Sequence, residues 1–149
     1  MKKSIFYLLG LALLLGACSK DNNATNADKL MGGQWRLTAL TTSFTYNGNE
    51  TTVDAYAQLA NCDKDDFFVF QSGGVFISDE GATLCNPSDP QQETGTWSFT
   101  QNETHLVISG TSVDFDAEIL ELTDSKLRVK YNEDLSGIAT TSELTFLKS

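Results

Sequence analysis

The chain has 149 residues, and its 20 Asp and Glu against 10 Lys and Arg give it a net charge of -10. This length suits one domain with short extensions, and 40% hydrophobic residues provide for a packed core, which excludes a chain that is disordered throughout. The acidic balance argues against a nucleic-acid partner, because binding to the phosphate backbone requires clustered Lys and Arg.

Residues 1–17 have the pattern of a secretory signal peptide. Lys2 and Lys3 form a positive start, and the apolar run that follows, residues 5–15, is interrupted only by Gly10. This run is too short to span a bilayer as a resident helix. We therefore predict that residues 1–17 are removed during export.

Cys18 ends the sequence Leu15-Gly16-Ala17-Cys18, which resembles a bacterial lipobox. The resemblance implies that Cys18 becomes the first residue and carries long acyl chains, so that the protein is anchored to a membrane; the alternative is an ordinary signal peptide followed by a chance Cys. Ser19, rather than Asp, follows Cys18, which by the same resemblance favours the outer membrane. The sequence does not distinguish between a protein on the periplasmic face of this membrane and one on the cell surface. The polar composition of residues 18–28 predicts a flexible tether.

Cys62 and Cys85 form an even pair in a chain that is predicted to be exported, which predicts a structural disulfide. A redox or metal-binding pair is the alternative, although the spacing is not C-x-x-C and no His lies near either Cys. The sequence contains one His, His105, and no nucleophile motif such as G-x-S-x-G whose Ser this His could activate. We therefore expect a protein that is not an enzyme and has no cofactor and no metal.

From residue 33 onward, apolar residues alternate with polar ones in the period of a β-strand. Trp35, Leu37 and Ala39, for example, share one face. Short connections predict that neighbouring strands pair antiparallel in an all-β, eight-stranded up-and-down barrel, with a two-sheet sandwich as the alternative. The phase changes between Ile119 and Leu120, which predicts a β-bulge. The eight strands are predicted near 34–44, 66–71, 74–79, 94–100, 104–110, 112–122, 126–132 and 138–148.

One connection, residues 45–65, is longer than most structureless loops. Val53, Tyr56, Ala57 and Ala60 recur in it at helical spacing, which predicts a short helix around 52–60. This segment is expected to lie across one mouth of the barrel, either as a packed cap or as a gate.

Gly33-Gln34-Trp35, at the start of the first predicted strand, is similar to the opening motif of lipocalins. Together with the lipobox, the 62–66 segment and Cys85, it resembles Bacteroidetes-type lipocalin-like lipoproteins. The resemblance implies that residues 29–149 form a lipocalin-like barrel with Trp35 plugging its closed end. Near the C-terminus, Lys148 is the residue close enough to pack over Trp35, where lipocalins place an Arg.

The predicted barrel interior is rich in aromatic residues. These side chains either fill a small barrel or line a cavity for a small apolar ligand, to which Tyr131 or Trp97 would offer a polar group. The candidate ligand-binding residues are Trp35, Phe68, Phe70, Trp97, Phe99, Phe115 and Tyr131, and Phe146 belongs to the same interior set.

Acidic residues gather beside Cys62, at Asp63, Asp65 and Asp66, and the pair at residues 79–80 is expected nearby. They are read as a solvated acidic rim rather than a Ca2+ site, since the spacing does not match an EF-hand. Asp114, Asp116 and Glu118 are expected on the outer face of one strand.

The function predicted from the sequence is that of a lipid-anchored, lipocalin-like protein of the outer membrane that binds a small apolar molecule. The alternative is an interaction or inhibitor module that binds a protein partner through its acidic loops, since a strongly acidic surface steers basic partners.

Overall fold

The computed structural model describes residues 24–149. The predicted signal peptide, Cys18 and most of the predicted tether lie outside these residues. Within the described part of the chain, no helix is both long enough and apolar enough to cross a membrane.

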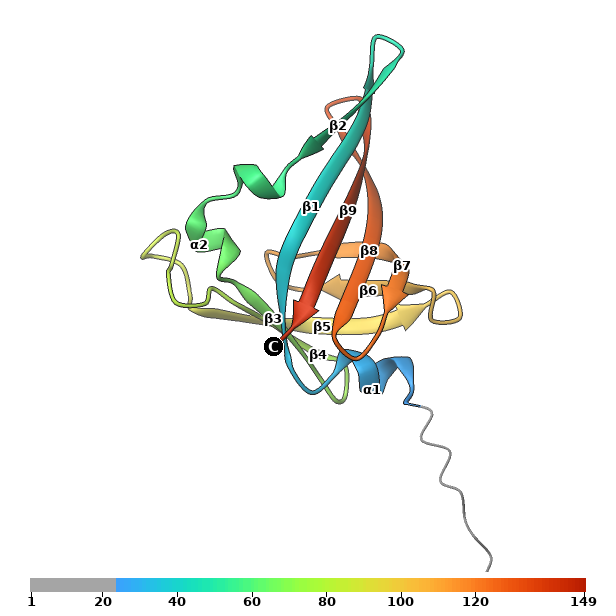
Figure 1. Ribbon diagram of the computed structural model, residues 1–149. Coiled ribbons are helices and arrows are strands. Elements are labelled where there is room, and N and C mark those ends of the chain that lie inside the picture. The colour runs from blue at the N-terminus through green and yellow to red at the C-terminus, as the bar shows by residue number, and fades with distance from the viewer. Residues whose placement is uncertain (1–23) are drawn as a thin grey trace, which may run out of the picture.

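The described residues form one antiparallel sheet of nine strands that closes on itself through β1 and β9 (Figure 1). β1 and β3 to β9 make the closed barrel, and β2 pairs only with the second half of β1. The predicted eight-stranded up-and-down barrel is thus confirmed, with one extra strand. The bounds are β1 (Gln34–Tyr46), β2 (Asn49–Asp54), β3 (Phe67–Gln71), β4 (Val75–Asp79), β5 (Gln92–Thr100), β6 (His105–Ser109), β7 (Phe115–Leu122), β8 (Lys126–Leu135) and β9 (Ile138–Lys148).

The long connection holds a strand that the helical spacing did not predict. A turn at Asn47 and Gly48, both with positive φ, reverses the chain so that β2 runs back along β1. The prediction of a helix over residues 52–54 is therefore wrong. A short helix does occur in this loop, as predicted, but as the 3-10 turn η1 (Tyr56–Gln58) followed by α2 (Asn61–Lys64). The Asp54 carboxylate accepts a hydrogen bond of 3.0 Å from the Ala57 amide at the start of η1.

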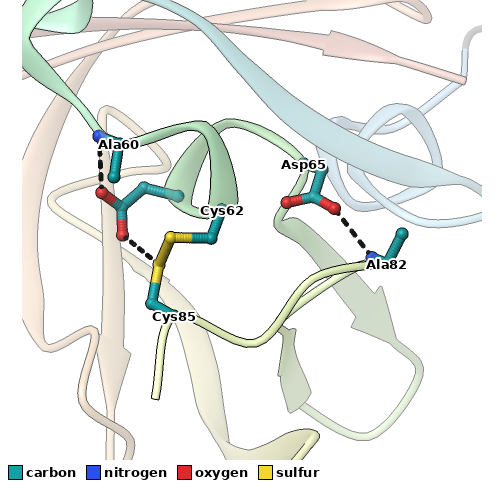
Figure 2. Close-up of a disulfide and its surroundings, with 6 residues drawn as sticks. Ala60, Cys62, Asp65, Ala82 and Cys85 are labelled. Carbon is teal, nitrogen blue, oxygen red and sulfur yellow. Dashed lines mark hydrogen bonds between the residues drawn. A yellow bond between two sulfur atoms is a disulfide. The ribbon is translucent and has the colours of Figure 1, made fainter. Parts of the chain in front are cut away.

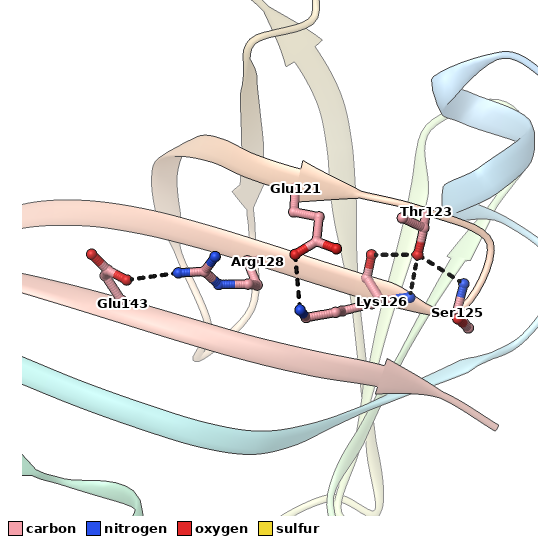
Figure 3. A network of polar contacts seen from close by, with 6 residues as sticks. All are labelled: Glu121, Thr123, Ser125, Lys126, Arg128 and Glu143. Carbon is pink, nitrogen blue, oxygen red and sulfur yellow. Dashed lines mark hydrogen bonds and ion pairs between the residues drawn. The ribbon is translucent and has the colours of Figure 1, made fainter.

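The outer wall of the barrel carries the ion pairs. The Lys126 ammonium lies 2.9 Å from Glu121, and Arg128 lies 3.2 Å from Glu143 on the neighbouring strand (Figure 3). His105 lies 2.9 Å from Asp116 on the same wall. The predicted bulge is confirmed, since the β7–β8 register shifts between residues 119 and 121. Polar side chains thus face outward in strands whose alternate residues are buried.

One end of the barrel is closed by α1 (Asn26–Leu30), which begins inside the range predicted as tether. The Thr25 hydroxyl caps this helix by accepting a hydrogen bond from the Asp28 amide. Trp35 is fully buried beneath it and donates through Nε1 to the Leu30 carbonyl at 2.7 Å. The Lys148 ammonium lies 4.8 Å from the centre of the Trp35 ring and donates to the Met31 carbonyl at 2.7 Å, so Lys148 packs over Trp35.

The half of the interior nearest the β3–β4 hairpin is filled by side chains. We call this set the packed half of the barrel. Its aromatic rings touch in tilted and edge-to-face arrangements, with ring centres 5.4 Å apart for Phe70 and Phe76 and 5.8 Å apart for Phe70 and Trp97. Its members are Phe70, Phe76, Trp97, Leu106 and Ile108, all of which are buried.

Candidate functional site

The other part of the barrel interior contains a cavity of about 490 Å3. It lies between the inner faces of β1, β3, β7, β8 and β9, the segment that carries η1 and α2, and the loop before β7. This volume falls within the range of roughly 300–1,000 Å3 that is typical of small-molecule sites. We call the residues around it the hollow half of the barrel.

Aromatic rings form much of the cavity wall. Trp35 and Phe146 are buried, while Phe68, Phe115 and Tyr131 are half-buried. Phe115 and Tyr131 stack with ring centres 6.1 Å apart. Four of the seven candidate ligand-binding residues thus line one cavity, and Phe146 lines it with them. Aliphatic residues complete the apolar wall, namely Leu37, Leu59, Val113 and Leu144.

The other three candidates, Phe70, Trp97 and Phe99, do not line this cavity. Phe70 and Trp97 belong to the packed half, and Phe99 packs edge-on against Trp97 with ring centres 5.5 Å apart. The Trp97 Nε1 group already donates to the Gln71 carbonyl at 2.9 Å. Trp97 therefore offers no polar group to a ligand, whereas Tyr131 remains at the cavity wall.

Tyr131 provides a neutral polar group in this wall. Burial raises the pKa of its phenol above the ordinary value, and Ser142, which lies beside it, opposes this rise. The hydroxyl therefore stays protonated at neutral pH and is able to donate or accept a hydrogen bond.

Acidic residues also line the cavity, although the sequence pattern did not predict them there. Asp63, Asp66, Asp114 and Glu133 contribute to its wall. Asp114 was expected on the outer face of a strand, but it lies in the loop before β7, because that strand begins only at Phe115. The period-two alternation indicated two of the other three: Asp66 shares the inward phase of residues 68 and 70, and Glu133 shares that of residues 127, 129 and 131.

Asp66 lies in a negative surrounding. Its pKa is raised to about 6, first by burial and then by the nearby charges of Glu80, Asp63, Asp65 and Asp79. Its Oδ1 atom is buried and accepts no hydrogen bond from the residues that the structure describes. The acidic residues predicted to gather here do gather, but two of them, Asp63 and Asp66, line the cavity rather than facing solvent alone.

The disulfide between Cys62 and Cys85 is confirmed, and it ties α2 to the loop that follows β4 (Figure 2). Asp63 lies next to it, with one carboxylate oxygen 3.1 Å from the Cys85 sulfur and the other accepting a hydrogen bond from the Ala60 amide at 3.0 Å. These three side chains lie close enough to resemble a metal-binding group. The sulfur atoms are bonded to each other, however, and metals bind the free thiolate.

A second link holds the same segment, which carries η1 and α2 and which we call the cap of the hollow half. The Ala82 amide donates to the Asp65 carboxylate at 2.9 Å, as Figure 2 shows. The chain can approach so closely because Gly81 has a φ of +69° and no Cβ, and a Cβ there would collide with the Asp65 carbonyl. The segment between Cys62 and Asp66, which carries two cavity-lining carboxylates, is therefore held in place from both ends.

A second hollow, of about 620 Å3, lies between the β1–β2 and β8–β9 hairpins. Its wall is mainly polar and acidic, with Ser43, Thr141, Glu50 and Asp134 among its residues. Small-molecule sites are usually mostly apolar. The aromatic cavity inside the barrel is therefore the better candidate for a ligand site.

The comparisons with known proteins agree with this architecture. A family model described as a lipocalin-like domain matches residues 31–129, which is more than half of the chain. The match includes Trp35 at the closed end, the disulfide and most of the cavity wall. No curated protein matches the chain. On the family match, the chain belongs to the lipocalin-like domain family.

Proposed function

We propose that the protein is a lipid-anchored binding protein of the outer membrane that holds a small, largely apolar molecule inside its barrel. The observation that carries this proposal is the cavity of about 490 Å3 with its aromatic wall. An apolar wall with a few polar groups favours binding of a partly apolar molecule, because transfer of its surface out of water is favourable.

The proposed anchor is compatible with access to this cavity. The described chain begins next to α1, which covers the closed end of the barrel, and the tips of the β1–β2 and β8–β9 hairpins lie at the other end of the molecule (Figure 1). A lipid on Cys18 would hold the closed end towards the membrane. Substitution Cys18→Ala is expected to abolish acylation and release the protein from membranes, as measured by labelling with a tagged fatty acid. Continued labelling would contradict the anchor.

The proposed role is binding without catalysis. Among residues 24–149, no hydroxyl group donates a hydrogen bond to a cavity-lining carboxylate, and His105 pairs with Asp116 on the outer wall. Nucleophilic catalysis by a hydroxyl group requires that this group be hydrogen-bonded to its base.

The experiment that tests ligand binding fills the cavity. Leu144 lines it, whereas Leu147 on the same strand is exposed. We expect the full-length protein and its Leu147→Trp variant to bind the neutral fluorescent probe N-phenylnaphthylamine. The Leu144→Trp variant should bind it at least about tenfold more weakly, because the added ring occupies the cavity. Equal binding by the two variants would place the probe elsewhere, and no binding by the wild type would contradict the proposal.

A protein partner is the second candidate. Tyr46 is 60% exposed and Leu135 is 51% exposed, and both lie near the tips of the long hairpins. Exposed aromatic side chains surrounded by polar groups are common in interfaces between proteins. Loss of a co-purifying partner in a Tyr46→Ser, Leu135→Ser variant with unchanged probe binding would favour this role.

A further inference from the structure

In the part of the chain that the structure describes, the charged residues of the cavity wall are all acidic. Its charged side chains are Asp63, Asp66, Asp114 and Glu133, which come from three separate parts of the chain. Asp66 is half-buried, and Asp114 and Glu133 are exposed. A ligand in this cavity is therefore surrounded by carboxylates that partly retain contact with water.

The basic residues do not compensate for these charges. Among residues 24–149, no Lys, Arg or His lines the cavity. Lys126, Arg128 and Lys130 pair with glutamates on the outer wall. Lys64 lies over the Tyr56 ring at 5.2 Å, and Lys148 lies over Trp35 at the closed end.

The electrostatic potential at Asp66 is negative, like the charge of the cavity wall. The charged groups that act on it are Glu80, Asp63, Asp65 and Asp79, and all of them are acidic. Asp79 is already satisfied by hydrogen bonds from the Gly81 amide and from two Gln side chains. The Oδ1 atoms of Asp65 and Asp66, in contrast, are buried without a donor from the described residues. A positive group placed beside Asp66 would relieve this repulsion.

The cavity has an aromatic wall, and its charged residues are all acidic. We therefore propose that the ligand is a cationic amphiphile, that is, a protonated amine attached to an apolar or aromatic body. This inference rests on the proposed ligand-binding function and specifies the chemical class of the ligand. The apolar body packs against Phe68, Phe115 and Phe146. The ammonium group lies towards Asp66 and Asp63, where carboxylates accept its hydrogen bonds.

The aromatic wall supports the same class of ligand. Cations bind favourably over the faces of aromatic rings, and Tyr131 and Phe115 present a stacked pair at the cavity. Fatty acids and other anions, by contrast, would bring a carboxylate next to carboxylates, which is unfavourable. The cavity therefore discriminates between ligands by the sign of their charge as well as by their shape.

The test compares three probes that share one ring system: naphthylethylamine, naphthylethanol and naphthylacetate. At neutral pH they are cationic, neutral and anionic, and titration calorimetry on the full-length protein measures their affinities. We expect the amine to bind about tenfold more tightly than the alcohol, as a hydrogen bond to a charged group would produce, and naphthylacetate to bind weakest. Ethylamine, which lacks the ring, should not bind measurably.

Two variants with the same change of charge separate a local contact from the general attraction of an acidic protein. Asp66→Asn alters the cavity, whereas Asp124→Asn alters the exposed turn between β7 and β8. We expect Asp66→Asn to remove most of the preference for the amine over the alcohol. Asp124→Asn should keep that preference and should bind naphthylethanol as the wild type does.

Each outcome separates the inference from the function on which it rests. Equal binding of the three probes, or a preference for naphthylacetate, would overturn the cationic ligand while leaving the barrel as a binding site. An equal loss of amine binding in the two variants would show unspecific attraction and would also overturn it. Failure of the protein to bind all three probes and the neutral probe N-phenylnaphthylamine would overturn the binding function itself.

Discussion

The packed half and the hollow half of the barrel are built from the same kinds of residue but differ in how completely side chains fill them. Phe70, Phe76 and Trp97 fill one half, and the Nε1 group of Trp97 donates its hydrogen bond to the Gln71 carbonyl. In the other half, Phe115 and Tyr131 border a cavity of about 490 Å3. Aromatic content alone therefore does not separate a packed core from the wall of a cavity. What separates them is whether neighbouring side chains meet, and whether charged groups share the inward face.

The largest expected effect compares one Phe from each half. Phe76→Ala should lower the free energy of unfolding by about 3–5 kcal/mol, because it opens a cavity in a filled core. Phe115→Ala should lower it by only about 1–2 kcal/mol, because Phe115 is half-buried and already borders empty space. Urea unfolding measures both values. Equal losses would show that the two halves do not differ in packing.

The disulfide stabilises the cap of the hollow half. It closes a loop with a sequence separation of 23, so the Cys62→Ser, Cys85→Ser variant should lose about 3 kcal/mol of stability. Thermal unfolding with and without reductant provides the measurement. Reductant should destabilise the wild type and leave the double variant unchanged. A wild type that is insensitive to reductant, although its disulfide is shown to be broken, would contradict this role.

The closed end can be tested through Lys148. Its ammonium donates to the carbonyls of Lys29 and Met31 and lies over Trp35, and burial lowers its pKa. Lys148→Met should cost about 1–2 kcal/mol, since it leaves those carbonyls without a donor. The control, Lys126→Met, removes a surface ion pair and should cost less than about 0.5 kcal/mol. Urea unfolding of the two variants compares them, and equal costs would mean that Lys148 is not part of the plug.

The smallest expected effect is a pH dependence that originates in the hollow half. The folded pKa of Asp66 is raised to about 6 from an ordinary value of 3.8, so the folded state binds this proton more tightly than the unfolded state. The contribution of Asp66 to stability should therefore fall as the pH rises from about 4 to above 6. In ligand-free protein, the melting temperature of Asp66→Asn should rise relative to that of the wild type over this range. A difference that is constant with pH would contradict the raised pKa.

Much of the fold follows from local patterns in the sequence. Alternation identified the eight barrel strands, and the change of phase at Leu120 predicted a bulge that the β7–β8 register contains. Strand β2 was missed because all of its residues are exposed, so that no alternation marks it. The Asn47-Gly48 turn and the β-branched residues that follow were the available signs.

The candidate site was harder to predict. Phe68 and Phe70 lie two residues apart on one face of β3, yet only Phe68 borders the cavity. The alternation shows which face is inward, but it does not show at which depth the facing side chains meet. The acidic part of the site was missed for another reason: Asp66 lies among acidic neighbours along the chain, which conceals that it shares the inward phase of β3, the strand that it precedes.

The most direct test of a hollow, ligand-binding half is native mass spectrometry of the exported protein, purified with no ligand added. We expect an additional mass of a few hundred daltons, which suits the cavity volume and disappears on denaturation. The Leu144→Trp variant should lack this mass, and the Leu147→Trp variant should retain it. A protein without additional mass, which stays so after incubation with naphthylethylamine and N-phenylnaphthylamine, would contradict the account.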